Sequence, residues 1–160
     1  MKEQTVMSLL TENPNGVLAR VIALFSRHGV TIGSLSVSAT AQQGVSRITV
    51  TAEGKSRGVA QLASQIRRLV DIRQVALLEG GVRRELLVAK LDAASPALLD
   101  LARQYQAEVL TAADGCPVVE CAGTPATLDA LLAELAPCQV VEFSRTVVAA
   151  PELTPMRSCG

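Results

Sequence analysis

Aromatic residues are scarce in this 160-residue chain, where Phe, Tyr and Trp make up 2% of the sequence and Trp is absent. Proteins that bind single-stranded nucleic acid usually stack the bases on aromatic rings, so the composition argues against that function. Apolar residues nevertheless reach 49%. The hydrophobic core must therefore be aliphatic, built from Val, Leu, Ile and Ala.

The chain also lacks net charge, because 15 Lys and Arg balance 15 Asp and Glu. It offers no broad electrostatic attraction to nucleic acid or to an anionic membrane, and a net charge near zero favours self-association. No apolar run reaches the roughly 18 residues that span a bilayer, and the N-terminus shows no signal-peptide pattern. We therefore expect a cytoplasmic protein that binds neither nucleic acid nor a membrane.

Residues that bind metals or carry out catalysis are few. The four cysteines form no C-x-x-C pair and lie far in sequence from the only histidine, His28, so a zinc site is disfavoured. We expect Cys116, Cys121 and Cys138 to be small buried hydrophobic residues and Cys159 to be a thiol in the tail. His28 is expected at a helix C-terminus, where a cation is favoured. The sequence predicts neither a metal site nor a catalytic residue.

The first 78 residues switch between helical and strand periodicity. Leu18, Val21, Ile22 and Phe25 have the spacing of one buried helical stripe. Gly29 can end this helix in the left-handed conformation. The predicted elements are a strand at 5–10, a helix at 16–28, strands at 30–39 and 45–52, a helix at 59–70 and a strand at 70–78.

A second set of elements follows a linker at 79–81, and it repeats the same order. Ser95 and Pro96 are expected to open its first helix, with Pro at the first helical position, and Thr124 and Pro125 its second. The strands are predicted at 84–91, 108–112, 117–122 and 139–148.

The fold class is therefore α+β, with two ferredoxin-like βαββαβ domains in tandem. We place the domains at 1–79 and 83–150. A flexible tail is expected at 151–160, a segment that contains two Pro, Pro151 and Pro155, and ends in Gly160.

The loop between the first strand and the first helix, at 12–18, is the strongest candidate site. Backbone N–H groups at a helix N-terminus favour an anion such as a carboxylate, and the amide of Asn13 can both donate and accept hydrogen bonds. The loop can thus hold the amino and carboxylate groups of an amino acid. An ordinary helix start is the alternative, with Asn15 as the N-cap and Gly16 as an entry residue.

The topology adds a second segment. In a βαββαβ domain Thr31 starts the second strand at the end of the sheet opposite the Asn13 loop. A symmetric dimer that pairs sheet edges would bring Thr31 of one chain beside Asn13 of the other. A ligand between them would couple its own binding to the geometry of the dimer.

Longer motifs point to a family. The runs 9–21 and 24–35, with the motif N-x-x-G-x-L at 13–18, resemble the ACT domain of the acetolactate synthase (acetohydroxyacid synthase) small subunit. Segments 45–50, 69–72 and 84–90 resemble later parts of that family in the same order. The family usually has Asn at the position of Thr31, and segment 144–148 lacks the family's Gly-containing ending.

The resemblance implies a regulatory, non-catalytic subunit. It would bind and activate a catalytic large subunit that uses thiamine diphosphate, Mg and FAD, while holding no cofactor itself. It would also form a homodimer through its ACT domains and confer feedback inhibition by valine or a related branched-chain amino acid. The implied effector site comprises Asn13, Asn15, Gly16, Val17 and Leu18 of one chain, with Thr31 and Ile32 of its partner.

Two other functions remain open at this stage. A stand-alone tandem ACT protein could sense an amino acid and regulate another enzyme or a transcription factor. A small enzyme on a ferredoxin-like scaffold is the third possibility, and the missing acid–base cluster argues against it.

Overall fold

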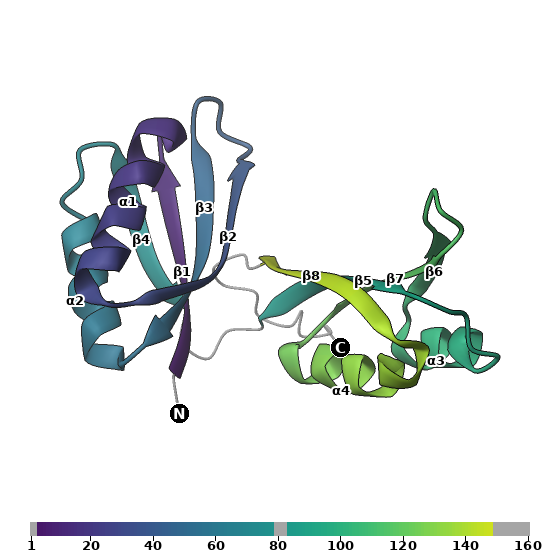
Figure 1. Cartoon of the computed structure of the whole chain (residues 1–160). Helices are drawn as coiled ribbons and strands as arrows, with labels where there is room; N and C mark the ends of the chain where they lie inside the picture. Colours follow the sequence, from purple (N-terminus) through teal and green to yellow (C-terminus); the bar gives the residue numbers. More distant parts are fainter. Residues whose placement is uncertain (1–2, 79–82, 149–160) are drawn as a thin grey trace, which may run out of the picture. The chain divides into compact units, whose positions relative to one another are not determined.

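The computed structural model describes residues 3–78 and 83–148, which form two compact units (Figure 1). The first unit lies within residues 3–78 and the second spans 83–148. The linker predicted at 79–81, the tail at 151–160 and Cys159 lie outside the described residues.

The first unit is an α/β sandwich in which two helices cover one face of a four-stranded antiparallel sheet (Figure 1). The strand order is β2-β3-β1-β4, and the predicted βαββαβ order is confirmed. Its elements are β1 (Glu3–Thr11), α1 (Pro14–His28), β2 (Thr31–Ala39), β3 (Ser46–Gly54), α2 (Ser56–Ile66) and β4 (Ile72–Leu78).

An aliphatic core holds this unit together. Strand alternation points Ile48 and Val50 of β3 toward the helices, where Val21, Phe25 and Leu62 meet them. All five are at most 1% exposed. Burial of each such side chain contributes about 1.5–3 kcal/mol, so this contact fixes the helices on the sheet and thereby the loops at its two ends.

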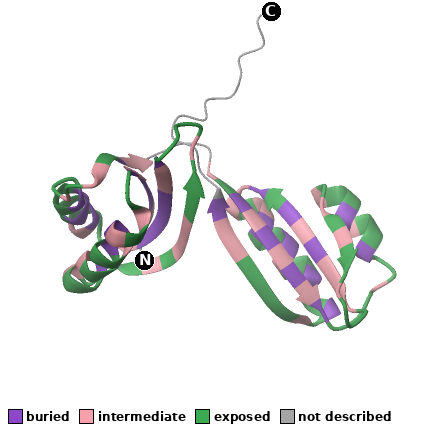
Figure 2. Cartoon of the chain, turned by 90° about the horizontal axis from the view of Figure 1, so that it is seen from above, coloured by how far each residue is buried: buried purple, intermediate pink, exposed green. Residues whose placement is uncertain are grey.

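The second unit repeats the arrangement with the strand order β6-β7-β5-β8. Leu87, Ala89 and Leu91 of β5 pack against Leu128 and Leu131 of the long helix. Figure 2 shows buried positions recurring along these strands. The elements are β5 (Arg84–Leu91), α3 (Leu98–Tyr105), β6 (Glu108–Thr111), β7 (Pro117–Gly123), α4 (Pro125–Leu135), a 3-10 turn (Ala136–Cys138) and β8 (Val140–Val148).

Four predicted helix boundaries were wrong: the starts of α1, α2 and α3 and the end of α2. α2 begins at Ser56, three residues before the predicted start, because Gly58 and Val59 already donate to the carbonyl of Lys55 at 2.8 and 3.1 Å. It ends at Ile66, after which a turn leads into β4. α3 begins at Leu98 and not at Pro96, since residues 95–97 form a separate turn.

Two burial predictions also need correction. Ile22 is 42% exposed, because Val17, Val21 and Phe25 form the buried stripe of α1 and Ile22 lies about 100° away from it around the helix. Cys116 is only partly buried, whereas Cys121 and Cys138 are buried as expected. None of the described helices is long and apolar enough to cross a membrane.

Candidate functional site

The loop between β1 and α1 is shaped by Asn13, which is the N-cap of α1. Its Oδ1 accepts a hydrogen bond from the backbone N–H of Gly16 at 3.3 Å, and its carbonyl accepts from Val17 at 3.1 Å. The N-cap expected at Asn15 was therefore wrong. Pro14, which has no N–H to satisfy, occupies the first turn of the helix.

Gly16 allows this capping geometry. A Cβ added there would lie 2.9 Å from Nδ2 of Asn13, too close without a shift of the Asn13 side chain. Asn13 and Asn15 are exposed, Leu18 is half-buried and Val17 is fully buried in the core. The loop thus offers two exposed side-chain amides and one helix N-terminus, and the buried Val17 anchors it to the core.

The electrostatics of the loop suit an anion. The first turn of α1 contains no acidic residue, and the carboxylate of Glu12 at the start of the loop is paired with Arg73. The partial positive charge of the helix N-terminus can therefore attract an anion. The oxygen of the Asn13 amide is used for capping, whereas its Nδ2 has no partner among the described residues and can donate.

Thr31 lies far from this loop within one chain. It is opposite Glu53 at one end of the β2–β3 pairing, whereas Ala39 is opposite Ser46 at the other end. Ser46 also pairs with Thr11, the last residue of β1. Thr31 is exposed, and the half-buried Ile32 packs against the core. A single chain therefore brings together the residues at 13–18 but separates them from Thr31 and Ile32.

β2 is an edge strand without the usual protection. Its nine residues, TIGSLSVSA, include no charged side chain and no Pro. Natural proteins commonly place charges or Pro on such edges to block pairing with another chain. A register shift near Gly33 occurs at the Thr31 end, and residues 34–39 are paired regularly with β3 on the inner side.

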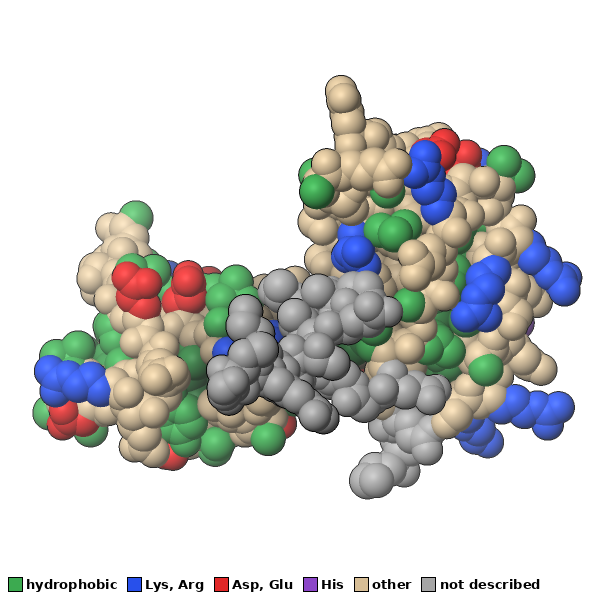
Figure 3. Space-filling model, turned by 180° about the vertical axis from the view of Figure 1, so that it is seen from behind, with side chains coloured by type: hydrophobic (Ala, Val, Ile, Leu, Met, Phe, Trp, Pro, Cys, Tyr) green, Lys and Arg blue, Asp and Glu red, His purple; other side chains and the backbone are tan. Residues whose placement is uncertain are grey.

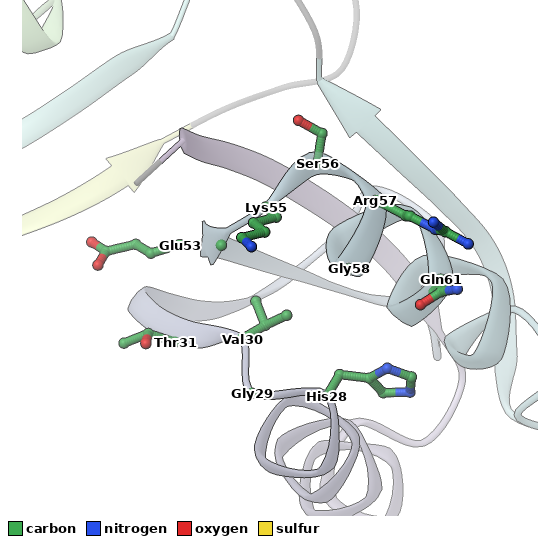
Figure 4. A pocket seen from close by; sticks show the side chains of 11 residues that line it. His28, Gly29, Val30, Thr31, Glu53, Lys55, Ser56, Arg57, Gly58 and Gln61 are labelled. Atoms are coloured by element: carbon green, nitrogen blue, oxygen red, sulfur yellow. The ribbon is translucent and has the colours of Figure 1, made fainter. Parts of the chain in front are cut away.

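A cavity of about 740 Å³ lies between the end of α1 and the start of α2, next to Thr31 (Figure 4). His28, Lys55 and Arg57 line it together with Glu53. Nε2 of His28 is buried and has no hydrogen-bond partner within the described part of the chain. Sequence reasoning missed this cavity, although two cations beside Gly54 and Gly58 were a usable signal.

The described residues contain no group of three or more His, Cys, Asp or Glu side chains placed to hold a metal ion. His28 is the last residue of α1, as predicted, and is half-buried there. Arg67 and Arg68, just after α2, are exposed.

Comparisons with known proteins agree on one family. Residues 13–75 match the family model of the ACT domain, and residues 84–152 match that of the small subunit of acetolactate synthase. The acetolactate synthase isozyme 3 small subunit of Escherichia coli (strain K12) is 33% identical over 149 residues, which cover 89% of this chain and 91% of that protein. The acetolactate synthase small subunit of Mycobacterium avium is 35% identical over 150 residues, covering 90% of each.

A solved structure shows the same fold. The crystal structure of the acetolactate synthase small subunit from Thermotoga maritima superimposes with a TM-score of 0.81 and 24% sequence identity. The likeness covers 95% of this chain and 99% of that chain, so it includes the folds of both units.

Proposed function

The chain belongs to the family of acetolactate synthase small subunits, and from this we propose that it activates a thiamine-diphosphate-dependent catalytic subunit and confers feedback inhibition by valine or a related branched-chain amino acid. The observation that carries the proposal is the similarity to named small subunits at 33–35% identity over about nine-tenths of the chain. The family resemblance inferred from the sequence is confirmed.

The domains take separate roles in this proposal. We assign residues 1–79 to the ACT domain that binds the effector and residues 83–150 to the second, ferredoxin-like domain. The chain holds no cofactor, and the thiamine diphosphate, Mg and FAD belong to the catalytic subunit. The complex works in the cytoplasm.

We place the effector between two copies of the chain. If the uncharged edges of β2 from two copies pair antiparallel about a two-fold axis, Thr31 of the second copy comes next to Ala39 of the first. That end of the sheet also carries the 13–18 loop, because Ala39 is opposite Ser46 and Ser46 is opposite Thr11, the last residue of β1. β1 lies two strands inward, or about 10 Å, from β2.

Different residues then bind the carboxylate of the amino acid and face its amino group and side chain. Nδ2 of Asn13 and the N-terminus of α1 hold the carboxylate, with Asn15, Gly16, Val17 and Leu18 shaping the loop around it. Thr31 and Ile32 of the second copy close the site and face the amino group and the aliphatic side chain. Binding between copies makes effector occupancy and dimer geometry depend on each other.

The experiment combines this chain with the purified acetolactate synthase catalytic subunit from the same organism. We expect the two proteins to elute together and acetolactate formation to rise when the chain is added. Valine, leucine or isoleucine should inhibit only the combined sample. Separate elution with unchanged activity would contradict the proposal.

A further inference from the structure

Both helices of the first unit lack acidic residues. α1 and α2 contain no Asp or Glu, and neither does the segment from 55 to 70. We call the exposed side of α1 and α2, with residues 55, 67 and 68, the basic helical face. Its cations, together with the titratable His28, are Arg20, Arg27, His28, Lys55, Arg57, Arg67 and Arg68.

The neutral chain in fact consists of two halves of opposite charge. Residues 1–82 contain nine Lys and Arg against five Asp and Glu, a net charge of +4, and residues 83–148 contain five against nine, a net charge of −4. Lys and Arg side chains stand out over the first unit in Figure 3. The positive charge is thus a property of one unit and is hidden in the total.

Most cations on the basic helical face have no acidic partner. Arg20 is 3.5 Å from Asp71, and Nη2 of Arg67 donates to the carbonyl of Val75 at 3.4 Å. Among the described residues no ion pair involves the remaining cations of the face, which are Arg27, Lys55, Arg57 and Arg68. These side chains are free to meet charges on another molecule.

The exposed sides of α1 and α2 also carry apolar residues. Ile22 is 42% exposed, and Ala19, Ala23 and Ala60 are also exposed. Protein interfaces are enriched in Arg and depleted in Asp, Glu and Lys, with an apolar centre inside a polar rim. The face has this composition, with five Arg, one Lys and no acidic residue.

The face is also hollowed. A cavity of about 530 Å³ runs between the helices and is lined by His28, Arg57, Gln61 and Arg68 among others. It shares His28, Arg57 and Gln61 with the larger cavity near Thr31. A protruding acidic side chain of a partner can enter this groove between two arginines.

We propose that the basic helical face docks onto an acidic surface of the catalytic subunit. The inference rests on the proposed function and assigns the surface that carries it out. Two-fold contact of this face with the same face of a second copy is disfavoured, because it would bring equal charges together. Nucleic acid fits less well, because the one aromatic residue of these helices, Phe25, is buried and no base can stack on it.

The test measures binding of the full chain to the purified catalytic subunit at low and at physiological salt. The double variant Arg57→Glu/Arg68→Glu should lose about tenfold or more in association rate at low salt, because surface charges act mainly on encounter. Both side chains are exposed, and a Glu in the first turn of α2 suits the helix dipole, so the variant should fold. Ile22→Gln should instead speed dissociation.

A matched control carries the same change of four charges on the second unit. Arg84→Glu/Arg103→Glu replaces two exposed arginines there, and we expect association within about twofold of the original chain. An equal loss in both double variants would show a general charge effect and overturn the assignment. Unchanged association in the Arg57/Arg68 variant would overturn it as well.

Further outcomes distinguish a failure of this inference from a failure of the proposed function. If the original chain neither binds nor activates the catalytic subunit, the proposed function fails. If it activates but the Arg57→Glu/Arg68→Glu variant activates equally well at every salt concentration, only the docking face is wrong. Binding to duplex RNA or to phosphatidylserine vesicles with no binding to the catalytic subunit would replace the partner and overturn the inference.

Discussion

Gly16 and Asn13 form the cap of α1 together. Because Gly16 has no Cβ, the capping amide of Asn13 has room, whereas a Cβ at position 16 would lie 2.9 Å from its Nδ2. Gly16→Asp would place a side chain and a negative charge in that space. We expect the variant to fold but to lose amino-acid binding, seen as loss of the rise in melting temperature on adding effector. At about one hundred times its dissociation constant an effector adds roughly 2.7 kcal/mol to stability.

Ala19→Asp is the control for this change, because it adds the same carboxylate one turn later on the exposed side of α1. It should keep most of the effector-induced shift. A full shift in Gly16→Asp would exclude the loop as the binding site.

Thr31 sets the affinity in the proposed site. A Thr hydroxyl reaches less far than the amide that the family usually has at this position, and one neutral hydrogen bond is worth about 0.5–1.5 kcal/mol. We expect Thr31→Asn to tighten effector binding roughly 2- to 12-fold by calorimetric titration. Thr31→Val, which keeps the shape without the hydroxyl, should weaken it, and unchanged affinity in both would remove Thr31 from the site.

Glu85 is the buried charge of the second unit, with its side chain 1% exposed between Arg83 and Arg145. Arg145 also contacts Asp129 at 2.5 Å and the carbonyl of Pro125 at 3.0 Å, which ties β8 to α4. Removal of one partner of a buried pair typically costs about 3–5 kcal/mol. We expect Glu85→Ala to lower the free energy of unfolding by about that amount in urea.

The matched control is Asp100→Ala, which breaks an exposed pair with Arg103 whose side chains are 79% and 78% exposed. Exposed pairs contribute about 0–1 kcal/mol, so this variant should unfold at nearly the original urea concentration. Equal losses in both variants would show that burial of Glu85 is not the cause.

At the scale of elements, the proposed dimer depends on the free edge of β2. Val37 is 44% exposed on this edge strand, and a charge on an edge prevents strand pairing. Val37→Lys should therefore give a monomer by light scattering and weaken effector binding. Val141→Lys alters the 59% exposed valine on β8, an edge strand of the other sheet, and should leave the mass unchanged.

Strands were easier to predict from the sequence than helix ends. Alternation at 45–52 and 84–91 identified β3 and β5 closely, because each has one face in the core. The start of α2 was missed since Lys55 offers no side-chain cap and Gly58 resembles a loop residue. The start of α1 was missed by two residues because both Asn13 and Asn15 are good caps, and only the contact with Gly16 distinguishes them.

The candidate site was predictable only in part. Strand order alone placed Thr31 and the 13–18 loop at opposite ends of the sheet. The cavities beside His28 were missed, because their linings combine residues of α1 and α2 that lie far apart in the sequence. The opposite net charges of the two halves can be counted from the sequence, but only once the chain is divided between residues 82 and 83.

At the scale of the whole molecule, each unit has its own hydrophobic core. An effector bound to the first unit should therefore stabilise that unit selectively. Differential scanning calorimetry of the full chain should show one transition that rises with effector concentration and a second that does not move. Parallel movement of the whole profile would mean that the units unfold as one.

α1 has one end at the 13–18 loop and the other at His28, three residues before Thr31. In the proposed dimer each copy of α1 then begins at one effector site and delivers its far end to the other, about 22 Å along the helix. α1 would therefore connect the two effector sites of the dimer. A displacement imposed by the first ligand would be carried along it, so we expect the two effector molecules of the proposed dimer to bind cooperatively.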